Sequence, residues 1–332
     1  MVRTCDFCYR MCELKEGQRG VCGIREHREG GIVTVNYGYL LAAAVDPIEK
    51  KPMYHFCPGE KTLSVALFGC NFSCTFCQNH DLSQRDSELF PASRRQLRGE
   101  YTSAEMLVRK MKECGVSIMS YTYSDPVVWQ DYMLDTAKIV HEQEGLNCMV
   151  TNGSFSGQSL KRVLPYIDGI NIDVKGDDQF YRTYCKGALS PVMKAVEAFT
   201  KRPGTVLEVT TLLIEGIHTL EDVRLLGAQL CSAGVQVWHL SRFFPHYHME
   251  ERRATSEEFL DQAIEIAREA GIPYVYGGNT GNPDHGITRC PSCGRQVVTR
   301  RGYYVRVQKE LQQSMLMNMC IECGQRIYGV FR

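Results

Sequence analysis

Cysteine spacing is the feature that most constrains what this chain can fold into. The 332 residues include 16 cysteines, and 11 of these fall into three tight groups. The groups are Cys5, Cys8, Cys12 and Cys22; Cys70, Cys74 and Cys77; and Cys290, Cys293, Cys320 and Cys323. The chain starts without the apolar segment of a signal peptide and has no run of about 18 apolar residues, so we expect a cytoplasmic protein without a membrane span. In that reducing compartment, closely spaced cysteines indicate metal ligation rather than disulfides.

Charge and hydrophobicity narrow the class of protein further. Lys and Arg total 38 and Asp and Glu total 38, so the formal net charge is zero. Hydrophobic residues make up 44% of the chain, which is typical of a folded globular protein and excludes wholesale disorder. A broad nucleic-acid-binding face would need a basic excess, so we do not expect nucleic acid as a partner.

Between residues 61 and 280, β-rich runs alternate with helical patterns. The runs cover 63–68, 116–122, 147–151, 169–174, 206–214, 235–240 and 273–276. The helical patterns cover 103–114, 127–144, 157–164, 188–201, 219–233 and 255–270. Three helices have capping-box patterns that begin at Thr102, Thr219 and Thr255. This alternation predicts an α/β protein with a parallel sheet, as a partial or full (β/α) barrel whose chemistry lies at the carboxyl ends of the strands.

The cysteine groups define a three-part plan. We expect a cysteine-rich N-terminal module over residues 1–60, the (β/α) barrel over 61–280 and a four-cysteine C-terminal module over 281–332. Three further cysteines, Cys114, Cys148 and Cys231, stand singly in helical or strand-like segments, and we interpret them as buried thiols.

The central group has the spacing Cys70-x3-Cys74-x2-Cys77 and follows the first barrel strand. Three thiolates can hold three irons of a [4Fe–4S] cluster, which leaves the fourth iron open to another ligand. An open coordination position is typical of a catalytic metal site. The alternative is a structural zinc loop that takes its fourth ligand from Cys57 or His80.

This loop resembles the signature of the radical S-adenosylmethionine (SAM) superfamily, Cys-x3-Cys-x-aromatic-Cys, with Phe76 as the aromatic residue. The resemblance implies that the open iron binds the amino and carboxylate groups of SAM. One electron from the reduced cluster then cleaves SAM, and the resulting 5′-deoxyadenosyl radical abstracts a hydrogen atom. It also implies that Phe76 packs near the adenine.

Two further strand ends carry candidate SAM contacts. Ser124-Asp125-Pro126 stands where radical SAM enzymes often have Gly-Gly-Glu-Pro, which implies that the acid accepts from the SAM ammonium. The alternative is a helix start built by Ser-Asp-Pro. Asp173 and Lys175 resemble the Asp-x-Lys pair of the glycyl-radical-enzyme activases, in which the lysine reaches the SAM carboxylate. The alternative is an ion pair at the barrel rim.

Three more candidates come from later strands and loops. Thr210 shares a strand face with Glu208, and we expect that face to point inward. His246 and His248 compete for the position of a histidine that lies near SAM in the activases, and an exposed loop histidine is the alternative for each. Cys185 is a candidate hydrogen-atom donor, with an ordinary helix-end thiol as the alternative.

Several strings together resemble one subgroup, the "AmmeMemoRadiSam system radical SAM enzyme" family, which is related to pyruvate formate-lyase activating enzyme. They are the N-terminal cysteine group, Phe56-Cys57-Pro58-Gly59, Gly69 through Asn79, Asn171 through Lys175, Phe180-Tyr181-Arg182, Trp238 through Pro245, and Gly278-Asn279 leading to Cys290 through Gly294. Cys57 and the Ser-Asp-Pro sequence depart from the family pattern. These motifs do not name a substrate.

The outer cysteine groups each predict a four-thiolate metal site. Cys290-x2-Cys293-x26-Cys320-x2-Cys323 is typical of a closed zinc ribbon, although iron accepts the same geometry. A basic, tyrosine-containing stretch lies between its cysteine pairs; we interpret it as a solvated face, with nucleic-acid or partner binding as the alternative. For the N-terminal group zinc is the first choice, and an auxiliary [4Fe–4S] cluster is the alternative.

These features predict an oxidoreductase-like radical SAM enzyme with a [4Fe–4S] cluster, SAM and zinc or iron at the outer sites. A glycyl-radical-enzyme activase is the alternative, and a non-catalytic metal-binding scaffold is a remote one. The predicted partners are an electron donor such as flavodoxin or ferredoxin and an unidentified substrate, either a small molecule or a partner protein.

Overall fold

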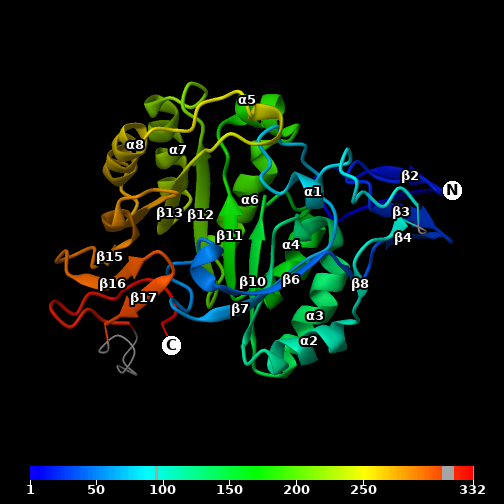
Figure 1. The fold of residues 1–332 in the computed structure, drawn as a ribbon, viewed down its shortest axis with the longest axis horizontal. Coiled ribbons are helices and arrows are strands. Elements are labelled where there is room, and N and C mark those ends of the chain that lie inside the picture. Colours follow the sequence, from blue (N-terminus) through cyan, green and yellow to red (C-terminus); the bar gives the residue numbers. More distant parts are fainter. Residues whose placement is uncertain (94–95, 309–317, 332) are drawn as a thin grey trace.

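A computed structural model describes residues 1–93, 96–308 and 318–331 of the chain. Its centre is an eight-stranded sheet with the order β14-β13-β12-β11-β10-β9-β7-β6 (Figure 1). The strands are β6 (Ala42–Pro47), β7 (Lys61–Ala66), β9 (Ile118–Tyr121), β10 (Leu146–Thr151), β11 (Gly169–Asp173), β12 (Val206–Leu213), β13 (Val237–Arg242) and β14 (Tyr274–Gly278). From β7 to β14 every pairing is parallel, and β6 pairs antiparallel with β7. All seven predicted strands are therefore confirmed.

The sheet is open, because β6 and β14 form its two edges. The full-barrel version of the prediction is therefore wrong, and the partial version fits. Closure would need a pairing between the last parallel strand and the first, and β7 has its free side covered by β6 instead.

The helices connect successive parallel strands. The longer ones are α2 (Ala104–Glu113), α3 (Gln130–Glu142), α4 (Gly157–Val163), α6 (Leu189–Thr200), α7 (Leu220–Ser232) and α8 (Glu257–Glu269), and they match the six predicted helical patterns. The short ones are α1 (His80–Ser83), α5 (Asp178–Phe180), η1 (Ile48–Lys50), η3 (Pro126–Trp129), η4 (Leu164–Tyr166), η5 (Tyr181–Cys185), η6 (Tyr247–Met249) and η7 (Pro283–Gly286). From β7 to β14, each parallel strand is added to the sheet beside the one before it, always in the same direction across the sheet. Right-handed crossovers therefore place the connecting helices on one face of the sheet.

The capping predictions were right for one helix and one residue off for two. Thr219 forms a full capping box at α7 with Asp222. At α2 and α8 the caps are Ser103 and Ser256, whose hydroxyls accept from the backbone of the third residue beyond. Thr255, one residue before its helix, instead donates its hydroxyl to the carbonyl of Leu213.

Two small β-modules lie on opposite sides of the sheet (Figure 1). The N-terminal one has the hairpins β1–β2 (Val2–Thr4, Glu13–Lys15) and β3–β4 (Arg25–Arg28, Gly31–Thr34), followed by β5–β8 (Tyr39–Leu40, Glu100–Tyr101). The C-terminal one has β15 (Thr288–Arg289), β16 (Gln296–Arg301) and β17 (Tyr304–Val307).

The boundaries at residues 60 and 280 stay predictions. The chain before residue 60 does more than form a separate module, because β6 belongs to the central sheet and Phe56 bridges to Val330 of the tail.

The single cysteines differ from the prediction. Cys148 is buried, as expected, but Cys114 and Cys231 are exposed, because each lies at the carboxyl end of an amphipathic helix where the last turn reaches the surface. Across the described residues we find no helix with the length and apolarity that crossing a membrane demands.

Candidate active site at the carboxyl end of the sheet

A cavity of about 340 Å³ opens where the parallel strands end. The cavity is lined by residues from all seven parallel strands or from the loops that follow them. The predicted site residues in its wall are Cys70, Cys74, Phe76, Cys77, Ser124, Asp125, Asp173, Lys175 and Thr210. Residues separated by 140 positions in sequence thus meet in one cavity, as expected for the functional edge of a parallel sheet.

The three-cysteine loop begins at a constrained turn. Gly69 has φ +128°, and a Cβ there would lie 2.8 Å from a side-chain carbon of Ile24, so the position requires glycine. Further along, the backbone amides of Ser73 and Thr75 donate to the carbonyls of Cys185 and Tyr184, at 2.9 Å each. These contacts hold the loop over the start of the cavity.

The donor set fits an iron–sulfur cluster. Burial raises the pKa of the Cys70 and Cys77 thiols, so a bound cation is needed to hold them as thiolates. Among the described residues, no three Cys, His, Asp or Glu ligand atoms at this loop lie mutually within 4.8 Å, as a single ion would require. Cys57 packs in a different buried cluster with Phe56 and Cys148, which gives no support to the structural zinc loop.

Asp125 is both a helix cap and a wall of the cavity. One carboxylate oxygen accepts from the amide of Val127 and the hydroxyl of Thr151, each at 3.0 Å, and the other accepts from the amide of Asn152 at 2.9 Å. Burial raises its pKa to about 6, although these donors oppose the shift. The helix-start interpretation is thus confirmed, and the carboxylate still faces the cavity.

The Ser124 hydroxyl already has hydrogen-bond partners within the protein. Its hydroxyl donates to the carbonyl of Leu67 and accepts from the indole N–H of Trp129 at 3.0 Å. It lines the cavity with little free hydrogen-bonding capacity.

Asp173 and Lys175 form an ion pair with an Nζ–Oδ2 distance of 2.8 Å. Their side chains are 34% and 14% exposed, so the pair lies at the cavity rim. The ammonium lies 5.9 Å from the ring centroid of Phe76. Burial would lower the pKa of Lys175, but Asp173 and the neighbouring thiols raise it well above its ordinary value, and the ammonium stays charged.

Two buried polar atoms in the cavity wall have no hydrogen-bond partner among the described residues: Oδ1 of Asn171 and Oγ1 of Thr210. Orphaned polar atoms at a cavity are costly unless a ligand or water satisfies them. Thr210 was predicted. Asn171 was missed as a site residue, although its alternation with Asp173 along the strand was a usable signal.

Two predicted residues do not line the cavity. His246 packs against His80, with ring centroids 5.1 Å apart. Cys185 is fully buried, and its backbone carbonyl accepts from the amide of Ser73 at 2.9 Å. The structure therefore does not place either residue with the other candidates.

Asn71 and Asn152 were not predicted and lie beside the three-cysteine loop. The Asn152 amide nitrogen donates to Oδ1 of Asn71 at 2.9 Å and lies 3.6 Å from Sγ of Cys70. The backbone carbonyl of Asn71 also accepts from the guanidinium of Arg10, in the N-terminal module, at 3.0 Å. No sequence pattern signals such a contact, because it joins segments that are distant along the chain.

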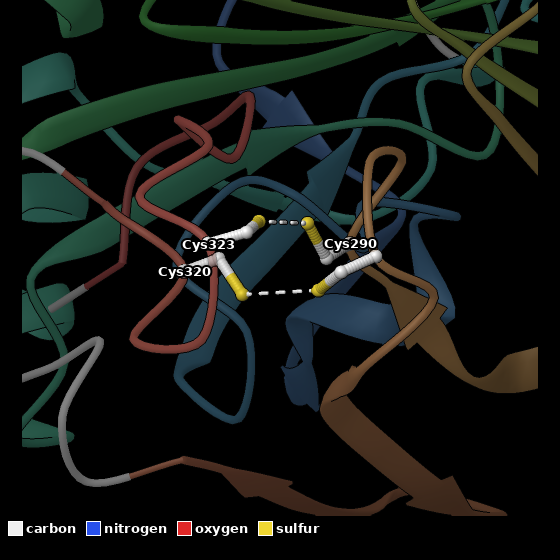
Figure 2. A group of neighbouring side chains, drawn as sticks. Cys290, Cys320 and Cys323 are labelled. Atoms are coloured by element: carbon white, nitrogen blue, oxygen red, sulfur yellow. Dashed lines mark hydrogen bonds between the residues drawn. The ribbon is translucent and has the colours of Figure 1, made fainter.

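The tail cysteines gather as a single-ion site. Sγ of Cys290 lies 3.6 Å from Sγ of Cys323, and Sγ of Cys293 lies 3.7 Å from Sγ of Cys320. All four sulfur atoms lie within 4.8 Å of one another, and Figure 2 shows the thiols pointing toward a common centre. Tetrahedral coordination with metal–sulfur bonds of about 2.3 Å requires sulfur separations of about 3.8 Å, so the predicted closed site has the right geometry.

Comparisons with known proteins agree with the site. The sequence model described as "Radical SAM superfamily" matches residues 65–227. The uncharacterized protein MJ0808 of Methanocaldococcus jannaschii is 36% identical over 338 residues, which cover 97% of this chain and 94% of that protein.

The solved structure of SuiB shares the fold. SuiB of Streptococcus suis, solved with its precursor peptide SuiA, has a TM-score of 0.52 at 14% identity; the match covers 70% of this chain and 52% of SuiB. This chain thus matches about half of SuiB. A domain of pyruvate-formate lyase-activating enzyme from Bacteroides vulgatus has a TM-score of 0.42 at 18% identity, with 48% of this chain and 98% of that chain covered. Together with the Cys70-x3-Cys74-x-Phe76-Cys77 loop at the carboxyl edge of the sheet, the sequence match shows that this chain belongs to the radical SAM superfamily.

Proposed function

We propose that the cavity binds a [4Fe–4S] cluster through Cys70, Cys74 and Cys77 together with SAM, and that the protein abstracts a hydrogen atom from a substrate. The single observation that carries this proposal is the convergence of three cysteine thiols, a buried acid and a lysine on one cavity. When bound, the cluster and SAM supply one-electron cleavage to a 5′-deoxyadenosyl radical. We propose a cytoplasmic setting, in which the thiols stay reduced.

Three side chains of the cavity wall suit three different groups of SAM. The Lys175 ammonium is charged and at the rim, so it suits the SAM carboxylate. The Asp125 carboxylate is buried in the wall of the same cavity and suits the SAM ammonium. The Phe76 ring is buried in the same wall and offers an apolar face for the adenine.

The substrate remains the open part of the proposal. The unpartnered Asn171 and Thr210 oxygens would recognise a polar group, with a small molecule as the favoured substrate and a partner-protein glycine as the alternative. An electron donor of the flavodoxin or ferredoxin class is the proposed partner.

The first test removes the central thiols. Anaerobically reconstituted protein with dithionite should convert SAM to 5′-deoxyadenosine and methionine, measured by mass spectrometry. The Cys70→Ala, Cys74→Ala, Cys77→Ala triple variant should lose this turnover, whereas the exposed Cys231→Ala control should keep it. Unchanged cleavage by the triple variant would reject the assignment.

The second test addresses SAM binding. Lys175→Met should weaken SAM affinity about 10–100-fold, because one charged contact contributes on the order of 1.5–3 kcal/mol. Its partner Asp173 is 34% exposed, so the freed carboxylate is solvated and the fold should persist. Titration calorimetry on the reconstituted variant would measure the dissociation constant, and an unchanged value would reject the role.

A further inference from the structure

The N-terminal cysteines Cys5, Cys8, Cys12 and Cys22 lie beside the central loop. Asn71 immediately follows Cys70 in sequence, and its side-chain amide donates to the hydroxyl of Ser154 at 2.7 Å, next to Phe155, which forms a β-bridge with Cys8. The side-chain oxygen of Asn71 accepts from Asn152 at 2.9 Å, and the same Asn152 nitrogen lies 3.6 Å from Sγ of Cys70. These contacts connect the central loop to the segment that pairs with Cys8.

Other contacts fix the N-terminal module against the same loop. The guanidinium of Arg10 donates to the carbonyl of Asn71 at 3.0 Å and also to that of Lys186. The amide of Tyr9 donates to Ser154 at 3.0 Å, and its ring packs edge-on against Phe72, a residue of the cavity wall. The position of Cys8 beside the central site is thus held from several sides.

The four N-terminal thiols are grouped less tightly than those of the tail. Cys5, Cys8 and Cys22 are buried, and the backbone amide of Cys5 donates to the carbonyl of Cys12 at 2.9 Å. Yet among the described residues no three of the N-terminal sulfur atoms lie mutually within 4.8 Å, whereas the four tail sulfur atoms do. A single tetrahedral ion needs sulfur separations of about 3.8 Å. A cubane cluster holds its thiolates farther apart, because irons and sulfides lie between them.

We propose that Cys5, Cys8, Cys12 and Cys22 bind a second [4Fe–4S] cluster that passes single electrons to the site at Cys70, Cys74 and Cys77. This inference rests on the proposed function, because it needs a central cluster as the electron acceptor. It replaces zinc, the first choice from sequence. All four irons have a thiolate ligand, so this site is closed to substrate and suited to electron transfer.

The electron balance is simple. A donor of the flavodoxin or ferredoxin class loses one electron, the N-terminal cluster is reduced from the 2+ to the 1+ state, and it is reoxidised as the central site is reduced. No bond forms or breaks at the N-terminal site. Of the four proposed ligands of the N-terminal cluster, Cys12 is partly exposed and follows the exposed Met11. An electron donor can therefore approach the cluster from the side of Cys12.

The first experiment counts iron in the absence of the central cluster. The Cys70→Ala, Cys74→Ala, Cys77→Ala variant, reconstituted anaerobically with iron and sulfide, should retain about four irons and four sulfides per chain beyond any iron in the tail. Dithionite should then produce an electron paramagnetic resonance signal of a reduced [4Fe–4S] cluster. A variant without sulfide, carrying a second zinc ion per chain, would overturn the inference.

The second experiment removes the N-terminal site. In the otherwise natural chain, Cys12→Ser should lower the sulfide content from about eight to about four per chain and remove one of two reduced-cluster signals. The matched control Cys231→Ser, also a change at a surface-accessible thiol, should keep both. Full sulfide content in the Cys12→Ser protein would contradict the assignment.

The two proposals fail separately. If the central triple variant still cleaves SAM, the proposed function is wrong whatever its iron content. If wild-type protein cleaves SAM but holds about four sulfides per chain, the function stands and the second cluster is wrong. Because the first experiment leaves the N-terminal module unchanged, misfolding of Cys12→Ser does not block the test.

Discussion

The two outer modules each present four cysteines, but at opposite ends of the sheet. The N-terminal module contacts the central loop at the carboxyl ends of the strands, where Arg10 donates to the carbonyl of Asn71. The tail packs near the amino ends of β12–β14, where the Tyr328 hydroxyl reaches the backbone of Leu207, and its buried cluster includes Tyr274 and Tyr276. We therefore propose electron transfer for the four cysteines at one end and a structural metal for the four at the other.

The modules also differ in how they are attached. The tail is fixed by Arg300, which is 2% exposed, donates to the carbonyl of Tyr54 at 2.6 Å and lies 3.9 Å from Glu49. The N-terminal module has two ion pairs to α3 and α4: Arg25–Asp131, whose arginine is buried, and Asp6–Arg162 at the surface, whose side chains are 32% and 38% exposed. Burial decides how much each contact stabilises the fold, so the comparison can be tested residue by residue.

The largest expected effect is from Cys320→Ser in the tail. A structural zinc site contributes on the order of 10 kcal/mol to the folding of its module. The variant should lose one tetrahedral metal by elemental analysis and show early proteolytic cuts after residue 281, while sulfide at the central site is retained. A tail that stays protected with its metal count unchanged would contradict a structural site, as would loss of the central cluster.

The next largest effect is expected from Arg300→Met. It leaves Glu49, which is 2% exposed, buried without its nearby cation, at a cost of about 3–5 kcal/mol in the free energy of unfolding. Urea denaturation would measure the loss. A change below about 1 kcal/mol would show that the tail does not depend on this buried pair.

Acid should weaken the attachment of the tail through His55. Its ring contacts the Tyr276 hydroxyl at 2.7 Å and the Tyr328 carbonyl at 2.6 Å, and burial lowers its pKa from 6.5 to about 4. Between those values the unfolded chain binds a proton that the folded chain does not, so stability falls as pH drops from about 6.5 to 4, by up to about 1.4 kcal/mol per pH unit.

The control for this acid effect is His55→Gln, which has no titrating ring. At pH 7 the free energy of unfolding of this variant should be lower than that of the natural chain. Between pH 6.5 and 4, however, the variant should lose less of it than the natural chain does. Urea denaturation at pH 7, 5 and 4 would measure the free energy of unfolding of both proteins. If that free energy fell equally with pH in both, His55 would not be the cause.

The smallest effect is expected from Arg162→Met, the surface counterpart of the Arg300 change. A solvent-screened ion pair contributes about 0–1 kcal/mol, so the free energy of unfolding should fall by less than about 1 kcal/mol. A loss equal to that of Arg300→Met would break the proposed difference between the two attachments.

Much of the fold was predictable from local patterns. The seven parallel strands and six longer helices follow from hydrophobic runs and periodicity, which are properties of neighbouring residues. Two caps were assigned one residue early, because only the threonines are followed three residues later by an acid, whereas the adjacent serines are the N-caps in the structure. Nine predicted site residues line one cavity, because strand ends of a parallel sheet meet at one edge.

Other residues could not be placed this way. His246 and Cys185 follow the right strands but do not line the cavity, because loop residues lack the alternation that fixes strand side chains. Asn71 and Asn152 were missed because an asparagine in a loop has no diagnostic spacing, whereas Asn171 was missed although it alternates with Asp173 along its strand. Their importance depends on partners that approach from distant segments.

The sequence by itself predicted the candidate ligands, the alternation of strands and helices and the edge of the sheet at which the candidate site lies, because these depend on residue type and spacing. Tertiary structure alone decided that the sheet stays open, that Arg10 reaches Asn71, and that the tail thiols converge while the N-terminal thiols stay farther apart. The physical reason is that distances between thiols, and the burial of charges such as Arg300, are set by packing between segments that are remote along the chain.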